Sequence, residues 1–138
     1  MEKLFFRDRE GSSAIEFALL APVFLLVVFS MIGYGIYLSA AHAVQQLAAD
    51  AARTAIAGIS ANERQRLATE FVGKAAPSHA FLTAENLQVI VKDDPANAEQ
   101  FTVTLSYDAR NLPIWNLYAV AMPSSRIDRF ATIRIGGI

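Results

Sequence analysis

The chain has 138 residues, 54% of them hydrophobic, and its 12 basic and 13 acidic side chains leave a net charge of −1. This length suits one small domain and one membrane anchor. The lack of a basic surplus argues against a nucleic-acid partner. The chain has no cysteine, which excludes disulfide bonds, thiolate metal ligands and cysteine nucleophiles together.

A long apolar segment lies near the N-terminus. Between Ser12 and Ala41 the only charged side chain is that of Glu16. The uncharged run 17–41 forms a helix of about 37 Å at a rise of about 1.5 Å per residue. A bilayer has a hydrocarbon core about 30 Å thick. We therefore expect a transmembrane helix over 12–41 that crosses the bilayer with some tilt.

Basic residues on the two sides of this segment predict its orientation. Lys3, Arg7 and Arg9 precede the apolar run, whereas only Arg53 follows it closely. By the positive-inside rule the N-terminus stays in the cytoplasm. We therefore expect a single-pass protein of the inner membrane, with residues 42–138 forming an exported, periplasmic domain.

Three residues inside the apolar run are candidates for helix packing. Pro22 removes one helical hydrogen bond, which a membrane helix tolerates where neighbouring groups bind the freed carbonyl. Gly33 and Gly35 would let another helix approach closely. Membrane helices are also rich in glycine without any such contact, so both interpretations stay open.

The residues at the start of the apolar run, GSSAIEFALLAP at 11–22, form a distinct pattern. The pattern resembles the processing site of class III prepilins and, more narrowly, that of the TadE-like pseudopilins of Tad (tight adherence) pilus systems. In these proteins a charged leader, here 1–11, ends in glycine and is removed by a prepilin peptidase. The resemblance implies cleavage between Gly11 and Ser12, which makes Glu16 the fifth residue of the mature chain.

The segment from Tyr37 to Gly58 is similar to the helix that follows in TadE-like sequences, an alanine-rich stretch with an acidic residue and an arginine, here Asp50 and Arg53. The resemblance implies a minor pilin that helps to initiate, cap or regulate assembly of an adhesive Tad pilus. Its implied partners are the membrane, a prepilin peptidase, other pilins and the Tad assembly platform proteins.

Glu16 is costly inside a membrane, by a few kcal/mol at the bilayer centre and less near the interface. The simplest interpretation places its carboxylate in the cytoplasmic headgroup layer. After cleavage, however, the new amino group of Ser12 lies one helical turn away, and an ammonium and a carboxylate can neutralise each other inside a helical bundle. Such a pair would set the axial register between subunits. Whether it forms within one chain or between chains stays open.

Two alternatives to prepilin processing remain. Ala41, His42 and Ala43 fit the small-x-small site of a secretory signal peptidase, with Val44 as the new N-terminus. The apolar run is longer than the roughly 7–15 residues of a signal h-region, which argues against this site. The other alternative is an unprocessed single-pass accessory protein of the envelope, whose exported domain binds a partner.

The helix should continue beyond the membrane and end near Gly58, because apolar residues recur at helical spacing. These residues are Val44, Leu47, Ala48, Ala51, Ala55, Ile56 and Ile59. Ser60 and Glu63 form a capping box, which predicts a second helix over 61–75 that ends before Pro77. In this helix we expect Leu67, Phe71 and Val72 to be buried and Arg64, Arg66, Glu70 and Lys74 to face water.

Alternation of apolar and polar residues then predicts three half-buried strands. Their inward residues are Leu87, Val89 and Val91, then Phe101, Val103, Leu105 and Tyr107, and finally Ala131, Ile133 and Ile135. The segment 93–97 supplies the turn between the first two strands. The predicted fold class is α+β: a long N-terminal transmembrane helix that extends into a small domain with a second helix and a three-stranded antiparallel sheet.

The connection 111–125 before the last strand is unusually apolar and contains Trp115 and Tyr118. One interpretation is that it crosses the sheet and closes the core. The other is that Trp115 and Tyr118 form an exposed patch that contacts a neighbouring subunit.

The sequence contains no recognisable catalytic or metal-binding motif. His42 and His79 are too isolated for a metal site. The acidic stretch of Asp93, Asp94, Asn97 and Glu99 does not match a calcium-binding loop and suits a solvated hairpin turn better. The arginines Arg126, Arg129 and Arg134 suit a solvated or salt-bridged strand surface. No nucleophile elbow or phosphate-binding loop is present. We therefore expect no enzyme activity, no metal or cofactor and no small-molecule substrate.

Overall fold

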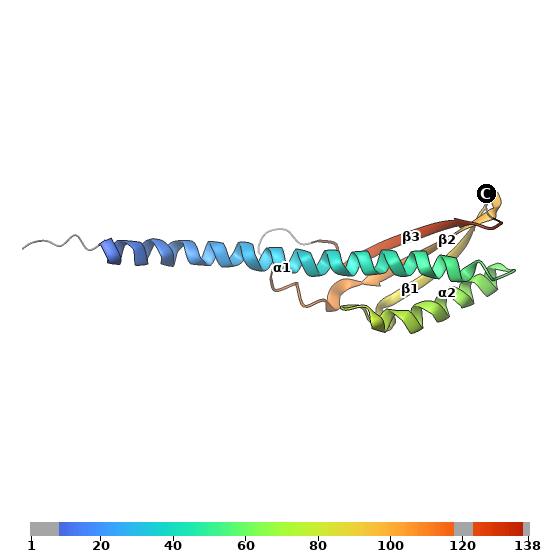
Figure 1. Ribbon diagram of the computed structural model, residues 1–138, viewed down its shortest axis with the longest axis horizontal. Coiled ribbons are helices and arrows are strands. Elements are labelled where there is room, and N and C mark those ends of the chain that lie inside the picture. The colour runs from blue at the N-terminus through green and yellow to red at the C-terminus, as the bar shows by residue number, and fades with distance from the viewer. Residues whose placement is uncertain (1–8, 118–122, 137–138) are drawn as a thin grey trace, which may run out of the picture.

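The structure is a computed structural model that describes residues 9–117 and 123–136. Its elements are α1 (Arg9–Ala55), α2 (Ala61–Ala75), the short 3₁₀ helices η1 (Ala76–Ser78) and η2 (Ala84–Asn86), β1 (Leu87–Asp94), β2 (Asn97–Asp108), η3 (Ala109–Asn111) and β3 (Arg126–Arg134). The N-terminal half of α1 projects from a small domain that the remaining elements build around its C-terminal half (Figure 1). The predicted α+β fold is confirmed.

Helix α1 is continuous over 47 residues and includes Pro22 without a break. At 1.5 Å per residue it is about 70 Å long. The predicted continuation past the apolar run is confirmed, but the helix ends at Ala55, three residues before Gly58. The prediction that Ile56 and Ile59 continue the apolar stripe of this helix was wrong, and their exposed fractions are 40% and 93%. Both residues follow the last helical turn.

The two halves of α1 have different surroundings. Between Ile15 and Leu38 most large apolar side chains are exposed. From Ala40 onward one face of the same helix is buried, with Val44 and Leu47 among its fully covered side chains. The N-terminal half therefore contacts little of its own chain, whereas the C-terminal half forms one wall of the domain core.

The sheet is antiparallel, with the strand order β1-β2-β3. The central strand β2 alternates as predicted, and its inward residues Phe101, Val103, Leu105 and Tyr107 are buried. They face α1 and α2, which cover this side of the sheet (Figure 1). The β1–β2 turn lies between Asp94 and Asn97, as expected. The side chains on the other sheet face are mostly polar.

Helix α2 begins with Ser60 as its N-cap, as predicted, but the carboxylate of the expected capping box binds the N–H of Ile59 instead of that of Ser60. The backbone N–H of Glu63 donates to the Ser60 hydroxyl at 3.2 Å, and the Glu63 carboxylate accepts from the N–H of Ile59 at 3.1 Å. Val72 is buried, and Leu67 and Phe71 are partly buried, as predicted. Arg66, Glu70 and Lys74 are exposed, also as predicted.

The prediction for Arg64 was wrong, because this side chain points into the domain. The residue is only 7% exposed. It lies four residues before Ala68 and eight before Val72, both buried, so it occupies the inward stripe of α2. A guanidinium in this place needs partners inside the protein.

The apolar connection after β2 contributes to the core. Leu112 and Ile114 are buried against it. Trp115 is partly buried, and its indole N–H donates to the carbonyl oxygen of Ala109 at 2.9 Å. The core-closing interpretation therefore holds for residues 112–115. Tyr118, the other aromatic residue of this prediction, lies outside the described residues.

Candidate functional site

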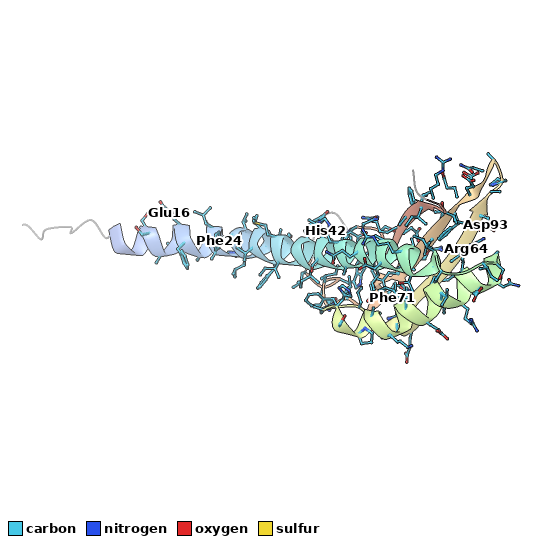
Figure 2. The ribbon with its side chains drawn as sticks, turned by 45° about the vertical axis from the view of Figure 1, so that its right-hand side comes forward. Glu16, Phe24, His42, Arg64, Phe71 and Asp93 are labelled. Atoms are coloured by element: carbon cyan, nitrogen blue, oxygen red, sulfur yellow. The ribbon has the colours of Figure 1, made fainter. Side chains whose placement is uncertain are left out.

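The predicted processing site lies at the exposed start of α1. Gly11 and Ser12 are helical and exposed, and so is Glu16. Residues four apart lie on the same face of a helix, separated by about 6 Å along its axis. Ser12 and Glu16 are therefore close enough to interact within one chain. Both are also accessible to a second chain, and Glu16 projects freely from α1 (Figure 2).

The helix beyond Glu16 presents apolar side chains on all sides. Phe17 and Met31 are at least 70% exposed, and Phe24 projects outward in the same way (Figure 2). Among the residues that the structure describes, α1 is the one helix long and apolar enough to cross a membrane. An apolar surface of this extent requires lipid or other helices to cover it.

The candidate packing residues do not share one face. Pro22 and Gly35 are exposed, and a side chain at Gly35 would meet nothing within 4 Å. Gly33 is buried instead. Residues two apart do not face the same side of a helix. Of the three candidates, Pro22 and Gly35 are therefore accessible to another helix, and Gly33 is not.

The C-terminal half of α1 carries a polar outward face. Asp50 and Arg53 form an exposed ion pair, with the Arg53 Nη1 2.7 Å from the Asp50 Oδ1. Exposed pairs of this kind contribute only about 0.2–1 kcal/mol to stability. On the same half, the side-chain amide of Gln45 donates to the Phe130 carbonyl at 3.1 Å and joins α1 to β3. His42 is exposed and His79 is partly buried.

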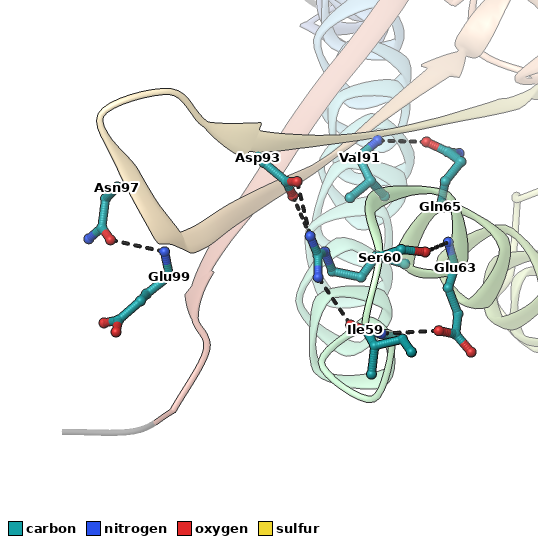
Figure 3. Close-up of polar contacts among 10 residues, drawn as sticks. Ile59, Ser60, Glu63, Gln65, Val91, Asp93, Asn97 and Glu99 are labelled. Atoms are coloured by element: carbon teal, nitrogen blue, oxygen red, sulfur yellow. Dashed lines mark hydrogen bonds and ion pairs between the residues drawn. The ribbon is translucent and has the colours of Figure 1, made fainter.

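Arg64 connects three segments of the domain. Its Nη2 donates to both carboxylate oxygens of Asp93, at 2.9 and 3.0 Å, and its Nη1 donates to the Gly58 carbonyl at 3.0 Å (Figure 3). Its guanidinium carbon lies 5.3 Å from the ring centre of Phe101. The contact with Asp93 was not predicted from the sequence, although the spacing of Arg64 to Ala68 and Val72 indicates an inward-facing side chain.

Gly58 allows the α1–α2 turn to pack against α2. A Cβ atom at this position would lie 2.7 Å from the backbone nitrogen of Arg64. Only a residue without a side chain fits this approach. Gly58 therefore sets the distance between the end of α1 and the start of α2.

The acidic β1–β2 turn has protein partners of its own. Asp94 accepts from the N–H of Ala96 at 2.8 Å, and Asn97 accepts from the N–H of Glu99 at 3.1 Å. Glu99 lies 3.3 Å from the guanidinium of Arg134. In the described parts of the chain, no three His, Asp or Glu side chains come together. These contacts agree with the hairpin-turn interpretation.

Two of the three arginines of β3, Arg126 and Arg134, form ion pairs, in line with the salt-bridged surface that the sequence suggested. Arg126 lies 3.2 Å from the Asp128 carboxylate. Arg129 donates to the Asp128 carbonyl at 2.8 Å. Arg134 pairs with Glu99 on the neighbouring strand β2.

A polar pocket of about 380 Å³ opens where β1 and β3 begin and β2 ends. Its lining includes Asn86, Ser106, Asp108, Arg110, Ser125 and Arg126. A second, more apolar hollow of about 540 Å³ adjoins it, lined by Arg110, Trp115, Pro123 and Ser125. Neither hollow is apparent from the sequence, because the lining residues come from distant segments that only the folded sheet brings together.

The polar pocket contains an ion pair between Arg110 and Asp108. The Arg110 Nη2 lies 2.5 Å from the Asp108 Oδ2. Hydrogen bonds from the side chain and backbone of Arg110 lower the pKa of Asp108 from 3.8 to about 2. Burial raises the pKa of the neighbouring Tyr107, whose hydroxyl donates to the Phe81 carbonyl at 2.7 Å. Asp108 therefore stays ionised, and Tyr107 neutral, at ordinary pH.

Comparison with known proteins bears on the N-terminal helix. Residues 11–53 match the family model of TadE-like protein. Comparisons with curated proteins and with solved structures give no match. The matched segment starts at Gly11 and ends at Arg53, so it covers the exposed half of α1 and most of the half that packs on the domain. In this segment, which forms most of α1, the chain is similar to TadE-like proteins.

Proposed function

We propose that the protein is a minor pilin, or pseudopilin, that helps to initiate, cap or regulate assembly of a Tad-type adhesive pilus. The observation that carries the proposal is the TadE-like segment 11–53 on a helix whose first half faces little of its own chain. Before assembly this half stands in the inner membrane, with the domain on the periplasmic side. Its partners are a prepilin peptidase, other pilins and the assembly platform proteins of the pilus system.

The exposed half of α1 suits both stages of this role. In the membrane, lipid covers its apolar side chains. In a filament, other helices take the place of the lipid, and a small residue such as Gly35 lets one of them approach. Glu16 then needs a positive partner, because an unpaired carboxylate in such a bundle costs several kcal/mol. The amino group that cleavage would create at Ser12 supplies this charge.

Burial along α1 favours a retained anchor over a secretory signal. Ala41 is 4% exposed and Ala43 is 9% exposed, both in the middle of a continuous helix. Cleavage between Ala43 and Val44 would remove Ala40, Ala41 and Ala43 from the domain core. The domain would lose part of its wall, so we expect the helix to stay attached.

The N-terminal mass of the protein isolated from native membranes tests the proposal. A mature chain that starts at Ser12 is the expected result, because a prepilin peptidase cuts after Gly11. An intact leader would contradict processing and favour the alternative, a single-pass envelope accessory protein whose domain binds a partner. A start at Val44 would overturn the anchor itself.

A further inference from the structure

The end of the domain nearest the exposed half of α1 carries polar and aromatic groups that pilus assembly does not explain. The element η3 and the start of β3 lie at this end (Figure 1). Arg110 and Arg126 line the polar pocket there, and their side chains are 75% and 63% exposed. Trp115 lines the adjoining apolar hollow. We call the surface formed by Arg110, Trp115 and Arg126 the domain base.

The length of α1 brings the domain base to the bilayer surface. With Glu16 in the cytoplasmic headgroup layer, about 20 residues at about 1.5 Å each cross the roughly 30 Å hydrocarbon core. Counted from Phe17, this stretch ends at Ile36. Ile36 and Tyr37 already pack against the domain core. No linker therefore separates the membrane from the domain, and the domain base falls within the headgroup layer.

The chemistry of the domain base matches that layer. Arginine guanidinium groups bind phosphate through paired N–H donors. Tryptophan is enriched at membrane interfaces, where its ring meets apolar chains and its N–H stays in a polar setting. The polar pocket and the apolar hollow share Arg110 and Ser125, so they form one continuous amphipathic surface.

The charge balance indicates which headgroups fit. Arg110 pairs with Asp108, and Arg126 pairs with Asp128, so the domain base holds both charges side by side. A zwitterionic headgroup with a phosphate and a primary ammonium complements this arrangement. A surface that attracted only anionic lipid would carry guanidinium groups without adjacent carboxylates.

We propose that the domain base binds phospholipid headgroups of the outer leaflet of the bilayer that α1 crosses. Arg110 and Arg126 contact the headgroup phosphate, and Trp115 lies at the boundary with the acyl chains. This inference rests on the membrane-anchor part of the proposed function. Its consequence is that the lipid surface holds the domain in one orientation until the subunit leaves the membrane.

Depth measurements on the full chain test this proposal. Because the protein has no cysteine, single cysteines label cleanly with a fluorophore. The test positions are Asn111→Cys and Asn116→Cys at the domain base, and the controls are Ala57→Cys and Ala96→Cys at the opposite end. Each variant is reconstituted in vesicles of phosphatidylethanolamine and phosphatidylglycerol that contain a headgroup nitroxide lipid. We expect at least about twofold stronger quenching at the test positions, since only they reach the headgroup layer.

A label at Leu26→Cys separates this inference from the proposed anchor. It should be quenched by a nitroxide deep in the acyl chains. If Leu26→Cys is quenched but all four domain positions give equal quenching, the lipid-binding inference is overturned and the anchor stands. If Leu26→Cys is not quenched either, α1 does not span the vesicle membrane, and the anchor and the inference fall together.

The arginines are tested with the native tryptophan. Trp115 is the only tryptophan in the chain, so headgroup nitroxide quenching of its fluorescence reports the domain base directly. We expect the double variant Arg110→Gln and Arg126→Gln to lose most of this quenching, whereas the matched control Arg53→Gln at the opposite end keeps it. Unchanged quenching in the double variant would overturn the contact between these arginines and phosphate.

Discussion

The buried guanidinium of Arg64 on α2 binds the carboxylate of Asp93 at the end of β1, with Nη2 2.9 Å from one oxygen and 3.0 Å from the other. The Arg64 side chain is 9% exposed, whereas that of Asp93 is 42% exposed. The same guanidinium donates to the Gly58 carbonyl. This one side chain therefore joins the α1–α2 turn, α2 and the β1–β2 hairpin at the end of the domain away from the apolar half of α1.

Asp93→Asn should destabilise the domain, because it leaves the buried Arg64 charge without its counter-ion. Loss of one partner of a fully buried pair costs about 3–5 kcal/mol. Asp93 is partly solvated, so we expect about 1–2 kcal/mol, closer to a lost hydrogen bond to a charged group. Denaturant unfolding in detergent, followed by Trp115 fluorescence, measures this loss. Asp50→Asn, which breaks the exposed pair with Arg53, is the control and should cost less than about 0.5 kcal/mol. Equal losses would contradict a structural role for the Arg64–Asp93 pair.

Gly58→Ala should also destabilise the domain, since its methyl group would meet the Arg64 backbone nitrogen at 2.7 Å. Forcing an atom into such a packed contact costs about 1–3 kcal/mol. The matched control is Gly73→Ala in α2, where a new Cβ atom meets nothing within 4 Å. That variant should gain about 0.5–1 kcal/mol, because alanine is the better helix former. Thermal unfolding followed by circular dichroism measures the stability of both variants. A Gly58→Ala variant as stable as the unaltered protein would show that the turn can move away from α2.

Glu16→Ala should keep the protein in the membrane but exclude it from pili. The variant leaves the Ser12 ammonium of the processed chain without its partner inside the bundle, at a cost of several kcal/mol. At about 1.4 kcal/mol per factor of ten, incorporation should fall more than tenfold. Immunoblots of sheared pili and of membranes measure the ratio of protein in pili to protein left in the membrane. Glu70→Ala, an exposed carboxylate on α2, is the control and should leave it unchanged. Normal incorporation of Glu16→Ala would contradict the register role.

Asp108 should remain ionised far into the acid range. Its pKa is lowered from 3.8 in the unfolded chain to about 2 in the folded protein by its hydrogen bonds from Arg110. A lowered folded-state pKa stabilises the protein above the unfolded value, and this stabilisation is lost as the pH falls through about 2. Carboxyl carbon NMR of the detergent-solubilised protein should give a midpoint near 2 for Asp108, and Arg110→Gln should raise it. A midpoint near 3.8 in the unaltered protein would contradict the pairing.

Local patterns predicted most of the elements. Hydrophobic continuity and then helical spacing predicted α1, because each signal depends on neighbours within a few residues. The Ser60–Glu63 cap predicted the start of α2 for the same reason. Alternation along β2 predicted which side chains enter the core, since the side-chain period of a strand is two. The pattern at Gly11–Glu16 predicted a resemblance to TadE-like proteins, which the family-model match over 11–53 bears out.

Arg64 shows where such reasoning fails. A charged residue in an amphipathic helix is expected to face water, because burying a charge is unfavourable without a partner. The partner, Asp93, lies 29 residues away and reaches Arg64 only once β1 packs beside α2. Gly33 and Gly35 also look equivalent in the sequence, yet Gly33 is buried and Gly35 is exposed in the folded chain.

The sequence by itself determined the long apolar helix, its change near Ala41 from a uniformly apolar to an amphipathic pattern, the N-cap of α2 and the inward faces of the strands. These features depend on the chemistry of adjacent residues. Only the tertiary structure decided that Arg64 is buried, that Gly58 must lack a side chain and that Arg110, Trp115 and Arg126 lie at the end of the domain nearest the exposed half of α1. Each of these depends on segments that are distant in the chain and come together when the sheet packs against the two helices.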